Sequence, residues 1–184
     1  GGIASNTNSN LLLNKESDWV VVEADEFDRS FLHLSPFASI VTAMDPDHLD
    51  VYGDASNFTD GFRQYAMKID PNGVCVVKEG LSLPTLCPSV SYGIDSETAD
   101  YKGYNLSYID GEMQFFIDTK SSRRVRFQLG LPGIHNVSNA LACIALLDQL
   151  GLPMADIQRG LASFKGVKRR FDVQIKTSDL VYID

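Results

Sequence analysis

Two acidic segments of the sequence each follow a short apolar run, a position in which carboxylates can hold a divalent cation. Glu23–Asp28 (EADEFD) comes directly after Trp19–Val22 (WVVV), and Asp45–Asp50 (DPDHLD) follows Ala38–Thr42 (ASIVT). Both apolar runs predict buried strands of a parallel sheet. Ligands of open α/β sheets bind at the carboxyl ends of such strands, and many nucleotide hydrolases hold Mg²⁺ on an acid that ends an apolar strand.

The two segments together give a sharper hypothesis than either gives alone. If the two strands are neighbours, Glu23 and His48 lie at the same edge of the sheet, where both could reach one cation. For each segment alone, a solvated turn is the competing interpretation. For His48, the competing interpretation is a turn histidine that caps a backbone group.

A third polar segment, Gly133–Asn139 (GIHNVSN), opens an otherwise apolar helix. His135, Asn136 and Asn139 share one side of its first turns because they are three or four residues apart. Side-chain amides there can hydrogen-bond the edge of a heterocycle, and the helix dipole favours anions. N-capping by Asn136 is the alternative, but it leaves Asn139 unexplained.

A fourth segment, Lys168–Asp172 (KRRFD), places three consecutive cations in an acidic chain. The guanidinium group of arginine offers paired donors to phosphate oxygens. A solvated turn between a helix and a strand explains the same residues equally well.

The elements that must position these residues follow from periodicity and from turn signals. Regular spacing of apolar residues predicts helices, and short apolar runs predict further strands. Alternating Tyr, Ile and Phe within Ala99–Leu129, broken by Asp110-Gly111, predict a small antiparallel hairpin unit. The fold class is therefore α/β, with a mostly parallel sheet flanked by helices. The predicted helices are Asp54–Ile69, His135–Leu150 and Ala155–Phe164, and the further strands are Val74–Val77, Val173–Ile175 and Leu180–Ile183.

Composition limits the classes of function. The 184 residues suffice for one domain, and 16 basic against 24 acidic residues give a net charge of −8, which argues against non-specific binding to nucleic acid. No apolar run approaches the roughly 20 residues of a membrane-spanning helix. Cys75, Cys87 and Cys143 are odd in number and form no CxxC pair, so we expect three buried thiols in a reducing compartment.

In this order and spacing, the four segments resemble the central domain of the Mur ligase family, over essentially the whole chain. The acidic segment is most similar to that of members that add L-alanine to UDP-N-acetylmuramate; family members that recycle muropeptides are the nearest competitor. The motifs that carry the resemblance are EADEFDRSFLHL (Glu23–Leu34), DPDHLD (Asp45–Asp50), LPGIHNVSNA (Leu131–Ala140) and RRFD (Arg169–Asp172).

The resemblance implies a cytoplasmic, ATP-dependent amide ligase of peptidoglycan synthesis with a P-loop-NTPase-like fold, and it implies residue roles. Glu23 and His48 match the ligands of the catalytic Mg²⁺. His135, Asn136 and Asn139 match the segment that contacts adenine. Arg170 matches the arginine that reaches the ATP phosphates, so His48 and Arg170 are the expected catalytic residues.

The resemblance also implies boundaries and departures. Residues 1–178 match the ATP-binding domain, and residues 179–184 match the start of the strand that leads to a C-terminal domain. The glycine-rich phosphate loop, which the family places upstream, is absent from this sequence, so we expect the chain alone to fold without catalysing. No family role can be given to Arg63, Gln64, Tyr65 or Lys68. A folylpolyglutamate synthetase relative and a non-catalytic nucleotide-binding module remain alternatives.

Overall fold

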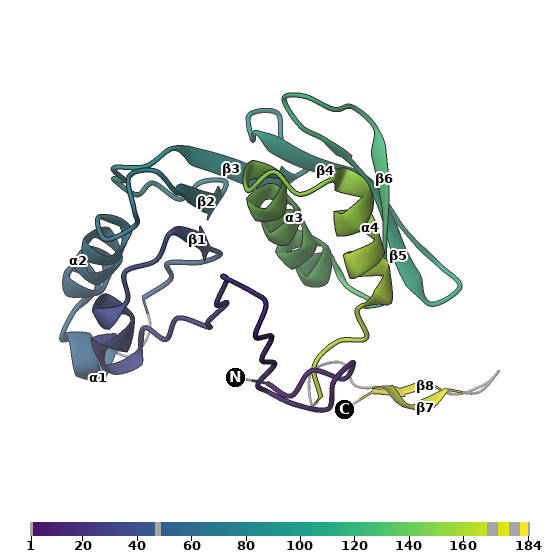
Figure 1. Cartoon of the computed structure of the whole chain (residues 1–184), viewed down its shortest axis with the longest axis horizontal. Helices are drawn as coiled ribbons and strands as arrows, with labels where there is room; N and C mark the ends of the chain where they lie inside the picture. The colour runs from purple at the N-terminus through teal and green to yellow at the C-terminus, as the bar shows by residue number, and fades with distance from the viewer. Residues whose placement is uncertain (1, 47–48, 169–172, 177–180, 184) are drawn as a thin grey trace.

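The computed structural model describes residues 2–46, 49–168, 173–176 and 181–183, and its centre is one six-stranded sheet (Figure 1). The spatial order of the strands equals their order in the sequence. The first three pairings are parallel and the last two are antiparallel. This confirms the predicted α/β class with an antiparallel unit. The strands are β1 (Ala38–Val41), β2 (Val74–Lys78), β3 (Ser89–Ile94), β4 (Tyr101–Ile109), β5 (Glu112–Asp118) and β6 (Val125–Leu129).

Helices lie on both sides of this sheet. In Figure 1, α3 crosses in front of the middle strands, α4 lies over the antiparallel part, and α2 lies at the opposite end beside β1 and β2. A separate antiparallel pair, β7 and β8, follows α4 in the chain. The remaining elements are η1 (a 3₁₀ helix, Phe27–His33), α1 (Leu49–Tyr52), α2 (Ala55–Ala66), α3 (Ile134–Gln149), α4 (Met154–Ser163), β7 (Val173–Lys176) and β8 (Val181–Ile183).

Strand β2 is buried on both faces, which explains its continuous apolar sequence. Val74 and Val76 belong to the large core cluster beneath α3, whereas Cys75 and Val77 belong to a smaller cluster on the other face, together with Ile69. Successive side chains of a strand point to opposite faces, so one apolar tetrapeptide serves both layers. The predicted strand at Val74–Val77 is confirmed.

The antiparallel unit also follows the predicted pattern. Asp110 and Gly111 have φ values of 54° and 89° and join β4 to β5, as expected for a tight hairpin turn whose two central residues both need positive φ. Alternate residues of β5, among them Phe115, are buried, and the Phe115 ring stacks on Phe127 of β6 at a centroid distance of 5.8 Å. Aromatic stacking therefore joins the last two strands on the core side.

The helix boundaries confirm the predictions to within a few residues. Asp54 is the N-cap of α2: its carboxylate accepts a hydrogen bond from the Asn57 amide at 2.8 Å. α2 ends at Ala66 instead of Ile69. Strand β3 was not predicted from the sequence, because Ser89–Ile94 includes two serines and a glycine and lacks a clear alternation of apolar residues.

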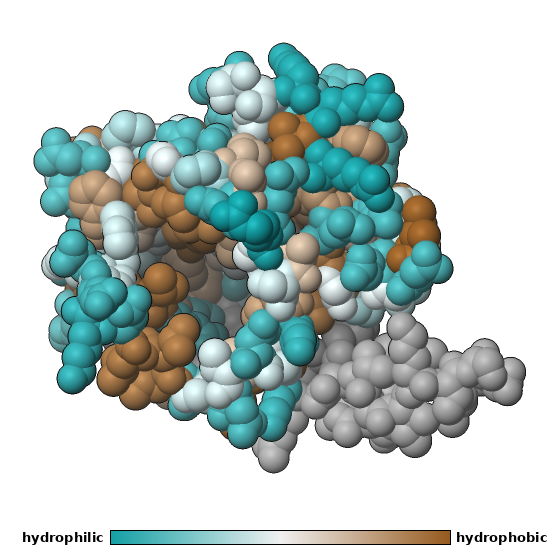
Figure 2. Space-filling view, turned by 45° about the vertical axis from the view of Figure 1, so that its right-hand side comes forward, coloured by the Kyte–Doolittle hydropathy of each residue, from teal (hydrophilic) through white to brown (hydrophobic). Residues whose placement is uncertain are grey.

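The predicted buried strand at Trp19–Val22 is wrong. These residues form no strand, and the four side chains are 54%, 83%, 96% and 60% exposed. A buried parallel strand needs a pairing strand, and the one partner of β1 in the described part of the chain is β2. Trp19 instead contacts Phe37 edge-on at 5.7 Å. Figure 2 shows brown, apolar side chains left on the surface around a hollow.

Two further expectations can be compared with the structure. Cys75 and Cys87 are buried free thiols, as predicted, but Cys143 is exposed. It lies two residues after the fully buried Leu141 of α3, and two residues turn an α-helix by about 200°, so Cys143 lies on a different face of the helix from Leu141. Among the described helices, none is long and apolar enough to cross a membrane.

Two buried tyrosines differ in how their hydroxyl groups are satisfied. The Tyr65 hydroxyl is 2.9 Å from that of Ser39, and both residues are buried. Tyr92 is fully buried, and its hydroxyl, next to Ser138 of α3, makes no well-formed hydrogen bond with the described residues. Burial raises the pKa of Tyr92 to about 12, although Ser138 opposes that rise.

This difference predicts opposite effects of the same substitution. Tyr65→Phe leaves the Ser39 hydroxyl buried without its partner and should lower the free energy of unfolding by about 1–2 kcal/mol. Tyr92→Phe removes a poorly satisfied hydroxyl and should leave that free energy unchanged or raise it by up to about 1 kcal/mol. Urea unfolding followed by circular dichroism measures both. An equal loss of stability in the two variants would contradict this interpretation.

Candidate functional site

A cavity of about 350 Å³ lies at the carboxyl end of β1, where the sequence predicts a ligand site. We call it the β1 cavity. Backbone and side chains from β1, from the acidic segment before η1 and from α2 enclose it. Its lining residues are Ala24, Glu26, Phe31, Ile40, Val41, Thr42, Ala43, Asp45, Phe58, Phe62 and Tyr65.

The acidic segment reaches this cavity through a compact loop instead of a strand end. The Asp25 carboxylate accepts a hydrogen bond from the Phe27 amide at 3.0 Å, and the Asp25 carbonyl accepts one from the Phe31 amide at 3.0 Å. Asp28 and Arg29 follow with φ values of 50° and 63°. Asp25 therefore stabilises the turn, while the neighbouring Glu26 lines the cavity.

Tyr52 of α1, two residues beyond the second acidic segment, holds this loop in place. Its hydroxyl donates a 2.6 Å hydrogen bond to the Glu26 carbonyl, and the Arg29 guanidinium lies 5.0 Å from the centre of its ring. Burial raises the pKa of Tyr52, so the hydroxyl keeps its proton near neutral pH and remains a donor. The structure thus joins the two acidic segments through a tyrosine that the sequence analysis did not single out.

Of the two predicted metal ligands, the structure describes only Glu23. Glu23 is exposed, adjoins Ala24 of the cavity wall and interacts with another residue. His48 lies outside the described residues, so its shared site with Glu23 remains a prediction. Within the described residues, the carboxylates that line the cavity are those of Glu26 and Asp45.

Aromatic residues of α2 form the opposite wall. Phe31 of η1 contacts Phe62 at 5.3 Å and Tyr65 at 5.1 Å between ring centres, and Phe62 contacts Phe58 at 5.1 Å. Phe58, Phe62 and Tyr65 recur at helical spacing, which is typical of an apolar helix face. Nothing in that spacing showed that the same face borders a cavity, and Tyr65 had no assigned role.

The first turns of α3 bring together His135, Asn136 and Asn139, but none of the three lines the β1 cavity. N-capping by Asn136 is ruled out, because Gly133 is the N-cap and the Asn136 side-chain amide donates to the Pro132 carbonyl at 2.6 Å. Asn139 is exposed on the second turn. These residues form a polar surface of their own at the start of α3.

The basic segment is described only at its first residue. The Lys168 amide donates to the Ile3 carbonyl at 2.9 Å, and its ammonium group bonds the Asn8 side chain. Lys168 therefore ties the end of the described domain to the N-terminal segment. Arg170 lies outside the described residues, and its predicted contact with phosphate stays a prediction.

The β1 cavity suits a hard divalent cation that keeps much of its water. No group of three or more His, Cys, Asp or Glu side chains in the described ranges is placed to hold a metal ion. Mg²⁺ requires only one or two protein carboxylates when phosphate oxygens and water complete its octahedron. Glu26 and Asp45 at the cavity wall, with Glu23 beside it, provide that donor chemistry.

Comparison with known sequences supports the resemblance to the Mur ligase family. The family model of the Mur ligase middle domain matches residues 3–147. The UDP-N-acetylmuramate–L-alanine ligase of Phocaeicola vulgatus is 42% identical over 185 residues, and that of Porphyromonas gingivalis (strain ATCC 33277) is 43% identical over 188 residues. In each case the alignment covers 100% of this chain but only 40% or 41% of the relative. The chain thus spans about two fifths of the length of these curated relatives.

Solved structures show the same fold. The UDP-N-acetylmuramate–alanine ligase of Thermotoga maritima superposes with a TM-score of 0.74 at 29% identity, over 85% of this chain and 35% of that one. A murein peptide ligase from Psychrobacter arcticus superposes with a TM-score of 0.61 at 20% identity, over 84% and 32% of the two chains. From the family match and the whole-length identities, this chain belongs to the Mur ligase middle-domain family.

Proposed function

We propose that the chain supplies the ATP-binding part of a ligase that joins L-alanine to UDP-N-acetylmuramate in peptidoglycan synthesis. The observation that carries this proposal is the 42–43% identity, over the whole chain, to relatives named for that reaction. The recycling ligase is a weaker candidate, because the murein peptide ligase of Psychrobacter arcticus shares the fold at only 20% identity.

The proposed reaction has two steps. The γ-phosphoryl group of ATP moves to the carboxylate of the muramoyl group, which gives ADP and an acyl phosphate. The amine of L-alanine then attacks the acyl carbon, an amide bond forms, and inorganic phosphate leaves. Several anionic oxygens meet in the first step, so cationic groups must offset their repulsion.

A Mg²⁺ ion held beside the carboxylates of the β1 cavity would meet this requirement. Bound Mg²⁺ would neutralise phosphate oxygens and orient them. We propose that Glu23 and His48 hold this ion, with Glu26 and Asp45 close enough to accept hydrogen bonds from its water shell. The Tyr52 hydrogen bond to the Glu26 carbonyl keeps the acidic loop in place before any ligand binds.

The nucleotide contacts complete the proposal. His135, Asn136 and Asn139 would contact adenine, and Arg170 would contact the ATP phosphates. Residues 1–178 would form the ATP-binding domain, and 179–184 would begin the connection to a further domain. The buried free thiols of Cys75 and Cys87 support a cytoplasmic location, since such thiols persist in a reducing compartment.

The activity is tested with the full-length protein that contains this chain. We expect phosphate release from ATP-Mg²⁺ that requires both UDP-N-acetylmuramate and L-alanine. Replacing L-alanine with the muropeptide L-alanyl-γ-D-glutamyl-diaminopimelate separates the two ligases. Turnover with the peptide and none with L-alanine would establish the recycling reaction. Nucleotide binding without turnover in either case would establish a non-catalytic module.

Kinetic constants test the proposed roles in the same protein. Asn139→Ala should raise the KM for ATP roughly tenfold with little change in kcat, because an adenine contact stabilises ground state and transition state alike. His48→Ala and Arg170→Ala should each lower kcat by about a hundredfold or more, since charge develops near them during phosphoryl transfer. A purely KM effect in all three variants would contradict these roles.

The metal role of Glu23 has its own test. Glu23→Gln removes the negative charge and retains the size of the side chain, so the Mg²⁺ concentration for half-maximal activity should rise roughly tenfold. Asp18→Asn, at an exposed acid five residues earlier, is the matched control and should leave that concentration within twofold. An equal rise in the two variants would show that the effect is one of general charge and not of ligation.

A further inference from the structure

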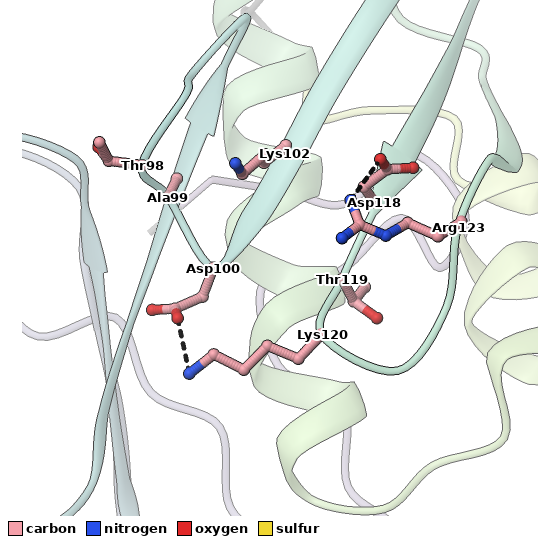
Figure 3. A pocket seen from close by; sticks show the side chains of 8 residues that line it. All are labelled: Thr98, Ala99, Asp100, Lys102, Asp118, Thr119, Lys120 and Arg123. Atoms are coloured by element: carbon pink, nitrogen blue, oxygen red, sulfur yellow. Dashed lines mark hydrogen bonds and ion pairs between the residues drawn. The ribbon is translucent and has the colours of Figure 1, made fainter.

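A second cavity, of about 220 Å³, lies where β4 begins and β5 ends (Figure 3). We call it the β4 cavity. It shares no lining residue with the β1 cavity. The register of the sheet gives the separation of the two cavities. Val41, which lines the β1 cavity, lies in one row with Val77 and Ser91, and the Ser91 amide donates a hydrogen bond to Asp100 of the β4 cavity. Three strand spacings separate them, or about 14 Å along the sheet. Its lining residues are Thr98, Ala99, Asp100, Lys102, Asp118, Thr119, Lys120 and Arg123.

The two carboxylates of this cavity already have several donors each. Asp100 accepts from the backbone amide and the hydroxyl of Ser91 at 2.8 and 3.0 Å, and it pairs with Lys120 at 2.8 Å. Burial alone would raise the pKa of Asp100, but the hydrogen bonds and charge of Lys120, together with the bonds from Ser91, hold the pKa below its usual value. Asp100 is therefore a fixed anion whose acceptor capacity is largely used.

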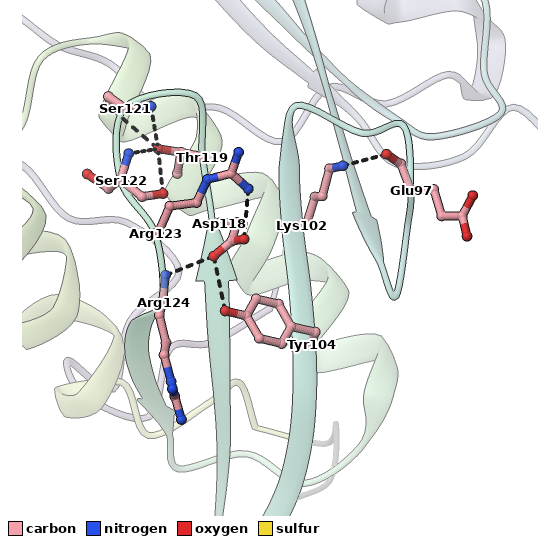
Figure 4. Close-up of polar contacts among 9 residues, drawn as sticks. All are labelled: Glu97, Lys102, Tyr104, Asp118, Thr119, Ser121, Ser122, Arg123 and Arg124. Carbon is pink, nitrogen blue, oxygen red and sulfur yellow. Dashed lines mark hydrogen bonds and ion pairs between the residues drawn. The ribbon is translucent and has the colours of Figure 1, made fainter.

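Asp118 is held in the same manner (Figure 4). One of its oxygens accepts from the Arg124 amide at 2.8 Å and from the Tyr104 hydroxyl at 3.0 Å, and the other pairs with Arg123 at 2.9 Å. The hydrogen bonds from Arg124 and Arg123 lower the pKa of Asp118. Its capacity to accept from a ligand is likewise largely used.

The cations, in contrast, keep unused donors. An ammonium group has three N–H donors and a guanidinium has five. Within the described structure, each of these groups uses one donor: Lys102 to the Glu97 carbonyl, Lys120 to Asp100 and Arg123 to Asp118. The Lys120 and Arg123 side chains are 80% and 74% exposed, so turning them toward a ligand costs little.

We propose that the β4 cavity binds a phosphate group through Lys102, Lys120 and Arg123. Figure 3 shows Lys102 on β4 and Lys120 and Arg123 on the β5–β6 loop, with Asp100 engaged by Lys120 and Asp118 by Arg123. Three cations on separate side chains match a group with several charged oxygens better than the two oxygens of a carboxylate. The cavity is about seven times the roughly 30 Å³ that a water molecule occupies, which is ample for such a group.

Affinity at this site should be modest. The whole chain carries a charge of −8, and the Glu79 carboxylate, which accepts from Ser96 and Thr98, also interacts with Lys102. We therefore expect a dissociation constant in the millimolar range for inorganic phosphate. The proposal is independent of the proposed ligase function, since it concerns a different cavity.

The test is a titration of the ¹⁵N-labelled 184-residue chain with inorganic phosphate at constant ionic strength, followed by amide chemical shifts. Saturable shifts should be confined to residues 98–102 and 118–124. Lys102→Gln, which removes a bond to the Glu97 carbonyl and a charge interaction with Glu79, and Arg123→Gln should each raise the dissociation constant at least fivefold. Lys68→Gln, at an exposed cation beyond α2, is the control and should change it less than twofold.

Two further arms identify the ligand. Titration with AMP in place of phosphate distinguishes a nucleotide phosphate, which should bind at least tenfold tighter if it is the natural source, from free phosphate. Acetate should bind at least fivefold more weakly than phosphate. The proposal is overturned if no shift saturates, if acetate binds as tightly as phosphate, or if the Lys102 and Arg123 variants behave like the Lys68 control.

Discussion

Strand β2 has to bury both of its faces, and the arrangement of the other elements follows from that requirement. Val74 and Val76 need a cover on one side, which α3 provides, while Cys75 and Val77 need a cover on the other, where Ile69 packs after α2. Parallel sheets are stable only when both faces are covered in this manner. The two layers in turn fix where β1 ends and therefore where the β1 cavity opens.

The close approach of α3 to the sheet depends on one small residue. A side chain at Gly103 of β4 would come within 2.6 Å of the Leu141 side chain, which is fully buried in α3. The same helix carries His135, Asn136 and Asn139 in its first turns, so the packing that seats Leu141 also fixes the position of the proposed adenine contacts. Core packing and site geometry are coupled here through a single helix.

The sequence predicted the elements whose signals are local and left out those that depend on distant partners. The Asp110-Gly111 turn, the Asp54 cap and the apolar tetrapeptide of β2 each carry their own signal. Trp19–Val22 carries the same signal as β2, but burial requires a pairing strand, which the local pattern cannot report. For the site, the acid-rich segments lie beside the cavity at the carboxyl end of β1. The Tyr52 bond to the Glu26 carbonyl and the Tyr65 contact with the Ser39 hydroxyl each join residues 26 positions apart, and no local spacing rule predicts them.

The two cavities show two ways for an acidic chain to accept an anion. The β1 cavity offers carboxylates at Glu26 and Asp45 and an aromatic wall, so a phosphate can approach only with a cation that the carboxylates help to hold. The β4 cavity already contains its cations, and its carboxylates are occupied by protein donors. At the proposed sites, binding in the first cavity would require Mg²⁺, whereas binding in the second would need no metal and would weaken with added salt. Phosphate binding that persists in the presence of a chelator and weakens with added chloride would therefore belong to the β4 cavity.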